Sequence, residues 1–194
     1  MRSAEEKVRN AVPEARGRKL ILYAPTFRGR VASAEAPDQL DISYMKERLS
    51  DEYFLLIKHH PFIKNRPPVP EDSAGFAKDV SDELNIDELL VASDVCISDY
   101  SSLVFEYSLM ERPMIFFSYD IADYSDWRGF YYDYNDLTPG PVYTSTEEVT
   151  DYIKALPESF ENGDRARVCE FREKFMSGCD GHATDRIIEF MKKK

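Results

Sequence analysis

Short apolar runs recur along the chain and alternate with stretches in which apolar residues return at helical spacing. The apolar runs predict buried strands, because polar or proline residues bound them at both ends. These predicted strands are Lys19–Ala24, Tyr53–Ile57, Phe76–Val80, Val95–Ile97 and Met114–Phe117. The periodic stretches predict helices at Leu40–Leu49, from Ser81 to Ala92, from Leu103 onward, and at Thr144–Leu156, Asp164–Met176 and Thr184–Lys192.

Strands that alternate with helices in this way imply βαβ units, and therefore a mostly parallel sheet covered by helices on both faces. We expect residues 19–194 to form one such α/β domain. Residues 1–18 are predicted as an N-terminal helix or linker, with Glu5–Val12 as a short amphipathic helix or tail.

Polar clusters follow the predicted strands at their carboxyl ends, where parallel sheets bind ligands. The clusters are Thr26–Arg30, Lys58–Pro61, Asp99–Ser102 and the aromatic and acidic tract that follows Phe117. Because these ends meet at one edge of a sheet, we predict one composite site.

The segment from Asp94 to Glu106 reads as a strand, a tight polar turn and a helix. The unpaired N–H groups and the dipole at the start of such a helix favour an anion, usually phosphate. The turn residues Asp99, Ser101 and Ser102 are therefore candidate phosphate-binding residues. An ordinary N-cap is the alternative interpretation.

The formal net charge of -11 argues against non-specific binding to nucleic acid, which needs a basic face. An anionic ligand would instead need cationic side chains gathered locally. Arg28, Arg30 and Lys58 are the candidates, although loop arginines are often simply exposed to solvent.

His60 precedes Pro61, which restrains the backbone of His60 at the end of a strand. It could donate a hydrogen bond to a pyrophosphate or a proton to a leaving phosphate. Alternation along the strand predicts that the adjacent His59 faces the other way. Glu106 lies one helical turn beyond the phosphate-binding turn and could accept hydrogen bonds from ribose hydroxyls, or it could be an ordinary exposed residue.

No apolar run approaches the roughly 20 residues that span a bilayer, and no signal peptide follows Met1. Three widely spaced cysteines predict neither a disulfide framework nor a zinc site. We expect no cofactor, while a divalent ion bound with a diphosphate stays an open alternative. A reducing cytosol fits best, and any peripheral contact with the inner face of a membrane would belong to a segment outside this sequence.

Several motifs occur in an order that resembles the C-terminal domain of the CDP-glycerol glycerophosphotransferases, the teichoic-acid primases and polymerases. They are Tyr23-Ala-Pro-Thr-Phe-Arg28, Lys58-His-His-Pro61, Asp94-Val-Cys-Ile-Ser-Asp-Tyr-Ser-Ser102, Phe105-Glu-Tyr107, Arg128-Gly-Phe-Tyr-Tyr-Asp133 and Pro139-Gly140. The sequence departs from the family at Phe27, where tryptophan is frequent, and at Glu106, where aspartate is common.

The resemblance implies the Rossmann-like C-terminal half of a two-domain GT-B fold, which binds CDP-glycerol as the donor. It implies that Arg28, His60 and the Ser101/Ser102 turn hold the diphosphate and that Glu106 lies near the cytidine ribose. Arg128 is a further donor-binding candidate. A separate N-terminal half would supply a histidine that activates the hydroxyl of a polymer or lipid-linked acceptor, and CMP would be released.

Two other classes of function remain open. A sugar-nucleotide glycosyltransferase half would share the fold and the diphosphate site but attack a sugar carbon. A non-catalytic receiver-like module would need an acidic pair after the first strand, where Pro25-Thr26-Phe27-Arg28 stands instead.

Overall fold

A computed structural model of the chain describes residues 2–122 and 133–193. Its centre is a six-stranded sheet in the order β3-β2-β1-β4-β5-β6, and every neighbouring pair is parallel. The strands are β1 (Lys19–Tyr23), β2 (Tyr53–Ile57), β3 (Ala77–Asp79), β4 (Val95–Ser98), β5 (Met114–Phe117) and β6 (Val142–Tyr143). The predicted parallel α/β architecture is therefore confirmed.

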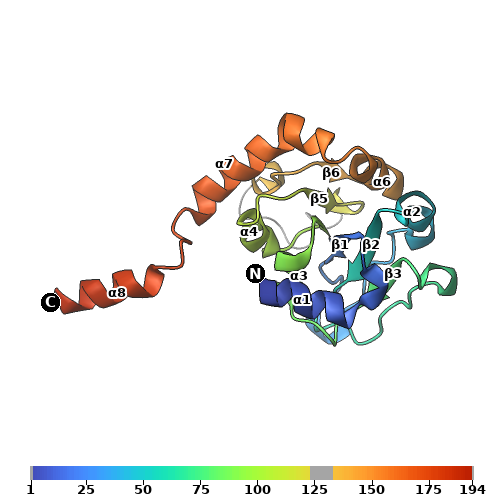
Figure 1. Cartoon of the computed structure of the whole chain (residues 1–194), viewed down its shortest axis with the longest axis horizontal. Coiled ribbons are helices and arrows are strands. Elements are labelled where there is room, and N and C mark those ends of the chain that lie inside the picture. The colour runs from blue at the N-terminus through green and yellow to red at the C-terminus, as the bar shows by residue number, and fades with distance from the viewer. Residues whose placement is uncertain (1, 123–132, 194) are drawn as a thin grey trace.

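Helices cover both faces of this sheet (Figure 1). The α-helices are α1 (Arg2–Ala11), α2 (Ile42–Leu49), α3 (Ile86–Ala92), α4 (Leu103–Ser108), α6 (Thr146–Lys154), α7 (Arg165–Met176) and α8 (Ala183–Lys192). Short 3₁₀ helices lie at Pro13–Ala15, Val31–Ser33, Glu71–Ser73 and Tyr134–Leu137, and a π-helix at Phe160–Asp164 precedes α7.

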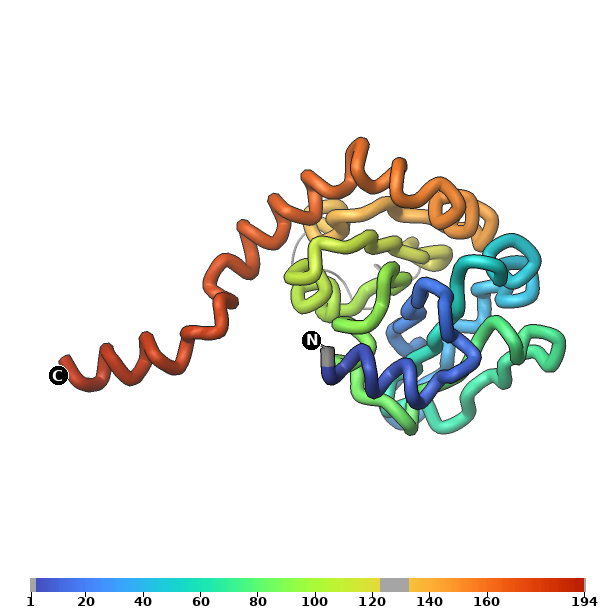
Figure 2. The backbone as a smooth tube through the Cα atoms, viewed as in Figure 1, coloured from blue at the N-terminus to red at the C-terminus, as the bar shows by residue number. Residues whose placement is uncertain are grey.

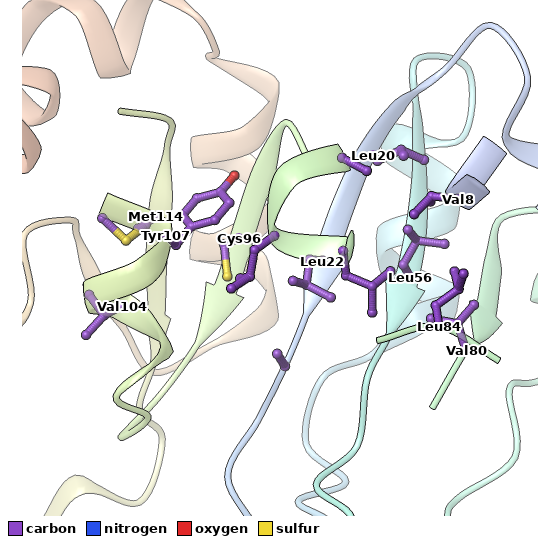
Figure 3. Packing of buried hydrophobic residues seen from close by; sticks show 14 of the residues in the cluster. Val8, Leu20, Leu22, Leu56, Val80, Leu84, Cys96, Val104, Tyr107 and Met114 are labelled. Carbon is purple, nitrogen blue, oxygen red and sulfur yellow. The ribbon is translucent and has the colours of Figure 1, made fainter. Parts of the chain in front are cut away.

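Alternation along each strand divides the core into two layers. Leu20 and Leu22 of β1 point to the face covered by α1, α3, α4 and α7, while Ile21 and Tyr23 point to the face covered by α2 and α6. Figure 3 shows the first layer, in which Leu20, Leu22 and Leu56 pack beside Val8 of α1. The strands β1, β2, β4 and β5 thus bury both of their faces, which explains why they read as continuous apolar runs.

The first helix is part of this core. Val8 of α1 and Val12 just after it are fully buried, and α1 packs against α3. Of the two alternatives expected for residues 5–12, the structure shows the amphipathic helix.

Two elements differ from the expectations. The helix predicted from Ser81 begins at Ile86, because a turn occupies residues 81–84 and Glu88 accepts a hydrogen bond from the Asn85 N–H at 3.1 Å, as in a capping box. The sequence also gave no sign of β6, which is only two residues long. Gly140 lets the chain approach β5 there, since a Cβ at this position would lie 1.9 Å from the Met114 carbonyl oxygen.

The last helix extends away from the body of the molecule (Figures 1 and 2). It carries four exposed large apolar residues, which are Ile187, Ile188, Phe190 and Met191. Within residues 2–122 and 133–193, none of the helices is long and apolar enough to cross a membrane.

Candidate functional site

A pocket of about 540 Å³ opens at the carboxyl ends of β1 and β2. We call it the switch-point pocket, because the strand order reverses between β1 and β4. Parallel α/β sheets bind ligands at this place, where loops of neighbouring strands diverge. Its lining includes the residues after β1, the residues after β2, the start of α3 and the start of α4.

The structure brings five of the predicted site residues to this pocket. They are Lys58, His60, Ser101, Ser102 and Glu106. Arg28, Arg30 and Asp99 are not among the residues that line it, and Arg128 lies outside the described residues. Of the four clusters predicted to form one site, those after β1, β2 and β4 each contribute residues to the pocket, although not every residue in them does. The described residues 118–122 of the fourth cluster do not line it.

The turn after β4 presents backbone donors to the pocket. The N–H groups of Ser101 and Ser102 donate to no carbonyl or side chain among the described residues, whereas the Leu103 N–H donates to the Ser101 hydroxyl at 3.3 Å. The helix that follows has only six residues, so its dipole adds little beyond these local N–H groups. The turn is thus suited to bind anionic oxygen through its N–H groups.

Lys58 is anchored at the edge of the same pocket. Its ammonium donates to the carbonyl oxygens of Ser81 at 2.7 Å and Leu84 at 2.6 Å. Burial lowers the pKa of Lys58, and the nearby Asp82 opposes this effect. An ammonium group carries three N–H donors, so one remains to reach a ligand.

His60 lies against Phe27 and Phe62, with ring centroids 4.9 Å and 4.6 Å away. Its Nδ1 accepts a hydrogen bond from the Phe62 N–H at 3.2 Å. A neutral imidazole whose Nδ1 accepts carries its proton on Nε2. The Phe62 N–H therefore selects the tautomer in which Nε2 is a donor.

His59 does not simply face away from this pocket. It lines the switch-point pocket together with His60, and it also lines a second pocket on the α2 side of the sheet. Strand geometry ends at Ile57, so the strict alternation that we used to separate the two histidines no longer applies. The expectation that only one of them reaches the crevice is wrong.

Arg28 ties three loops together. Its guanidinium pairs with Asp99 at 2.9 Å and with Asp120 at 2.5 Å, and it donates to the Thr26 carbonyl oxygen at 2.9 Å. The Tyr100 ring lies 5.1 Å from the guanidinium carbon. Burial would lower the pKa of Arg28, but the hydrogen bond to Asp120 and the charge of Asp99 raise it above its ordinary value.

Asp99 is accordingly a buried structural carboxylate. It is 3% exposed and accepts hydrogen bonds from the Thr26 N–H at 2.9 Å and the Tyr100 N–H at 2.7 Å. Arg30 is exposed on the loop beyond. A role for Arg28 in holding a donor remains a prediction.

The far wall of the pocket was not singled out from the sequence. Asn85, Ile86 and Leu90, at the start of α3, give it an apolar surface with one amide. Asn85 followed three residues later by Glu88 is the sequence pattern of a capping box and could have located the start of α3. It was missed because the helix was predicted to begin at Ser81. Among the described residues, no group of three His, Cys, Asp or Glu side chains could hold a metal ion.

The parallel sheet and its switch-point pocket define the class of this protein as a Rossmann-like ligand-binding α/β domain. Comparison with known proteins narrows the class. Residues 1–193 match the family described as CDP-Glycerol:Poly(glycerophosphate) glycerophosphotransferase. The chain belongs to this family.

Curated relatives are teichoic-acid enzymes. The chain is 41% identical over 187 residues to a teichoic acid poly(ribitol-phosphate) polymerase of Bacillus spizizenii, covering 95% of this chain and 29% of the polymerase. It is 36% identical over 177 residues to a teichoic acid glycerol-phosphate transferase of Staphylococcus aureus, covering 89% of this chain and 44% of that enzyme. The chain thus spans less than half the length of these relatives.

Solved structures agree with the fold. The wall teichoic acid polymerase TagF superposes with a TM-score of 0.82 at 30% identity, covering 99% of this chain and 47% of the polymerase chain. A histidine-to-asparagine variant of that polymerase, soaked with CDPG, gives the same TM-score. The fold class expected from the resemblance, the C-terminal half of a GT-B fold, is confirmed.

Proposed function

We propose that this chain is the donor-binding domain of a transferase that moves glycerol phosphate from CDP-glycerol to a polymer or lipid-linked hydroxyl and releases CMP. The observation that carries the proposal is the switch-point pocket, where Ser101, Ser102, Lys58 and His60 place hydrogen-bond donors at one edge of the sheet. Membership of the family and similarity to teichoic-acid polyol-phosphate transferases support the same reaction.

The proposed reaction is a displacement at phosphorus. The acceptor hydroxyl attacks the β-phosphorus, the bond from that phosphorus to the bridging oxygen breaks, and CMP leaves with the electron pair. Charge on the diphosphate oxygens is stabilised by the N–H groups of Ser101 and Ser102, by the Nε2–H of His60 and by the remaining Lys58 donor. Catalysis then depends on positioning and on charge stabilisation.

The tautomer of His60 bears on its part in this reaction. Because its Nδ1 already accepts from the Phe62 N–H, His60 is suited to donate a hydrogen bond from Nε2 as a neutral ring. Of the two roles expected from the sequence, we favour this hydrogen bond to a phosphate oxygen over transfer of a proton to the leaving group.

The wall formed by Asn85, Ile86 and Leu90 is the proposed place for the cytidine. Ile86 and Leu90 offer an apolar surface to the ring, and the Asn85 amide can pair with polar atoms of the base. Glu106, which is exposed at the opposite lip, is available to accept hydrogen bonds from ribose hydroxyls.

The rest of the active site is proposed to come from a partner half. The chain covers 46% to 47% of the polymerase structures that it matches, so a second domain would face this pocket and supply the acceptor. A histidine in that half would activate the acceptor hydroxyl. We further propose that the complete enzyme acts in the cytoplasm, with any contact to the inner face of the membrane made by that other half.

A thermal-shift series tests the donor class. At a 100-fold excess over Kd, a true donor should raise the midpoint by roughly 5–10 °C for a chain of this size. We expect CDP-glycerol or CDP-ribitol to produce this shift and a UDP-sugar to produce none. Stabilisation by the UDP-sugar alone would favour the sugar-nucleotide transferase instead, and the two CDP-polyols together distinguish glycerol from ribitol.

A further inference from the structure

A second pocket lies on the other side of the sheet edge from the switch-point pocket. We call it the α2-side pocket. It has a volume of about 330 Å³, at the small end of the roughly 300–1,000 Å³ range of ligand pockets. Tyr23 at the end of β1, His59 after β2 and Asp38 before α2 line it, and Pro67 and Pro68 contribute apolar surface.

His59 lines both pockets and contains an unsatisfied polar atom. The residue is 4% exposed, and its Nδ1 has no hydrogen-bond partner among the described residues. The His59 N–H donates to the Ser81 hydroxyl at 2.8 Å, which fixes the backbone but leaves the ring unpaired there. A buried polar atom without a partner is rare in folded proteins, and a ligand group is one explanation for it.

The groups around His59 limit the kind of ligand. Burial lowers the pKa of His59, so the ring is neutral and offers one donor and one acceptor. Burial also raises the pKa of Tyr23, which keeps its hydroxyl protonated. Asp38 lines the pocket, and its negative charge acts on both His59 and Tyr23. Asp41 lines it too, although its carboxylate already accepts a hydrogen bond from the Tyr44 N–H at 2.9 Å. Among the described residues that line this pocket, none is a lysine or arginine.

An anion is disfavoured in such surroundings, because the Asp38 charge lies near His59 and the described lining residues include no lysine or arginine. The one cation whose charge acts on His59 is Arg66, which does not line the pocket among the described residues. Hydroxyl groups fit better, since each can donate to a carboxylate and also exchange a hydrogen bond with a neutral imidazole or phenol. The small volume restricts the ligand to a short chain of carbons.

We propose that the α2-side pocket binds a neutral polyol group, with His59 at the junction between this group and a phosphate in the switch-point pocket. The inference rests on the proposed function, in which a CDP-polyol occupies the switch-point pocket. The polyol can come from two sources, the outer end of the donor or the terminal unit of the acceptor.

Calorimetry with CDP-glycerol and CDP separates the polyol contribution from the nucleotide contribution. The chain should bind CDP-glycerol about tenfold more tightly than CDP, the effect of roughly one additional good hydrogen bond. Asp38→Ala should remove most of this difference while changing the affinity for CDP less than twofold. Asp51→Ala, at an exposed aspartate outside both pockets, is the matched control and should change neither affinity.

Imidazole NMR supplies a readout that leaves His59 intact. The chain has three histidines, so the His59 ring signals can be assigned through substitution of the other two. Because His59 also lines the switch-point pocket, CDP alone should shift the His59 signals, and CDP-glycerol should shift them further. If the two nucleotides act alike, titration of sn-glycerol 3-phosphate into the CDP-saturated chain tests the acceptor as the source. A shift that Asp38→Ala weakens would support the polyol site.

The outcomes separate this inference from the proposed function. Failure of both CDP and CDP-glycerol to bind would overturn both. Binding of both nucleotides with no effect of Asp38→Ala, and no response of His59 to either polyol probe beyond its response to CDP, would overturn the α2-side polyol site alone. Equal weakening of CDP and CDP-glycerol by Asp38→Ala would also overturn it, because the effect would then lie in the nucleotide site.

Discussion

Replacing Arg28 by alanine tests whether its guanidinium stabilises the folded loops or serves mainly to bind a ligand. In the structure it donates to Asp99 at 2.9 Å and to Asp120 at 2.5 Å, and its side chain is only 18% exposed. Arg28→Ala therefore leaves the buried Asp99 carboxylate without its cation. We expect the main effect of this substitution to be a loss of stability.

The expected loss in the free energy of unfolding depends on the hydrogen bonds that Asp99 retains in the variant. Breaking a buried ion pair from one side costs about 3–5 kcal/mol. Asp99 retains hydrogen bonds from the Thr26 N–H, the Thr26 hydroxyl and the Tyr100 N–H, so we expect a value near the lower end, about 3 kcal/mol. With a urea slope of about 3 kcal/mol per molar, the unfolding midpoint should fall by roughly 1 M.

Urea unfolding followed by circular dichroism measures this shift. Arg28→Ala combined with Asp99→Asn should recover much of the stability, because the second change removes the unpaired charge. Arg30→Ala, at the exposed arginine of the same loop, should stay within about 0.5 kcal/mol of the wild type. A midpoint for Arg28→Ala equal to that of Arg30→Ala would refute the structural role and favour a guanidinium kept for the ligand.

The same variant has a predictable response to pH. Burial raises the pKa of Asp99, and the charge of Arg28 opposes this rise. Without Arg28 the folded-state pKa lies still higher, so protonation of Asp99 favours the folded state at low pH, and that contribution is lost as the pH rises. The stability deficit of Arg28→Ala should be smaller at about pH 4 than at about pH 8.

Three further predictions concern activity and packing. The chain alone should show no acceptor-dependent release of CMP from CDP-glycerol, because half of a crevice cannot exclude water or present an acceptor; robust turnover would contradict this. In a protein that carries both halves, His60→Ala should lower turnover by about 10²–10³-fold and His60→Gln by less, since the amide keeps a donor near Nε2; equal losses would instead indicate proton transfer. Gly140→Ala should cost about 2–3 kcal/mol in urea unfolding, because its Cβ would lie 1.9 Å from the Met114 carbonyl oxygen, whereas Gly75→Ala meets nothing within 4 Å; similar midpoints for the two variants would show that the β5 contact relaxes.

The strands of the core were predictable because a strand that is buried on both faces needs apolar residues at successive positions. Tyr53–Ile57 is such an unbroken apolar run. The pocket was predictable for a related reason, since parallel strands bring their carboxyl ends to one edge. β6 was not predictable, because two residues between Pro141 and Thr144 are too few to form a pattern.

The surroundings of Arg28 could not be read from the sequence either. Arg28 and Asp120 are 92 positions apart, and nothing local marks them as partners. Sequence reasoning therefore treated the arginine as a free cation. The unpaired Nδ1 of His59 could not be predicted either, because it depends on how distant segments pack around the ring.

The Arg28 contacts have a consequence for recombination among relatives. The loops after β1, β4 and β5 carry Thr26, Asp99 and Asp120, and one guanidinium joins all three. A chimera that takes only one of these loops from a homologue with different charges would inherit an unmatched ion in the interior. Loop exchange intended to alter substrate preference should therefore transplant the three segments as a set, and natural lineages should exchange them together for the same reason.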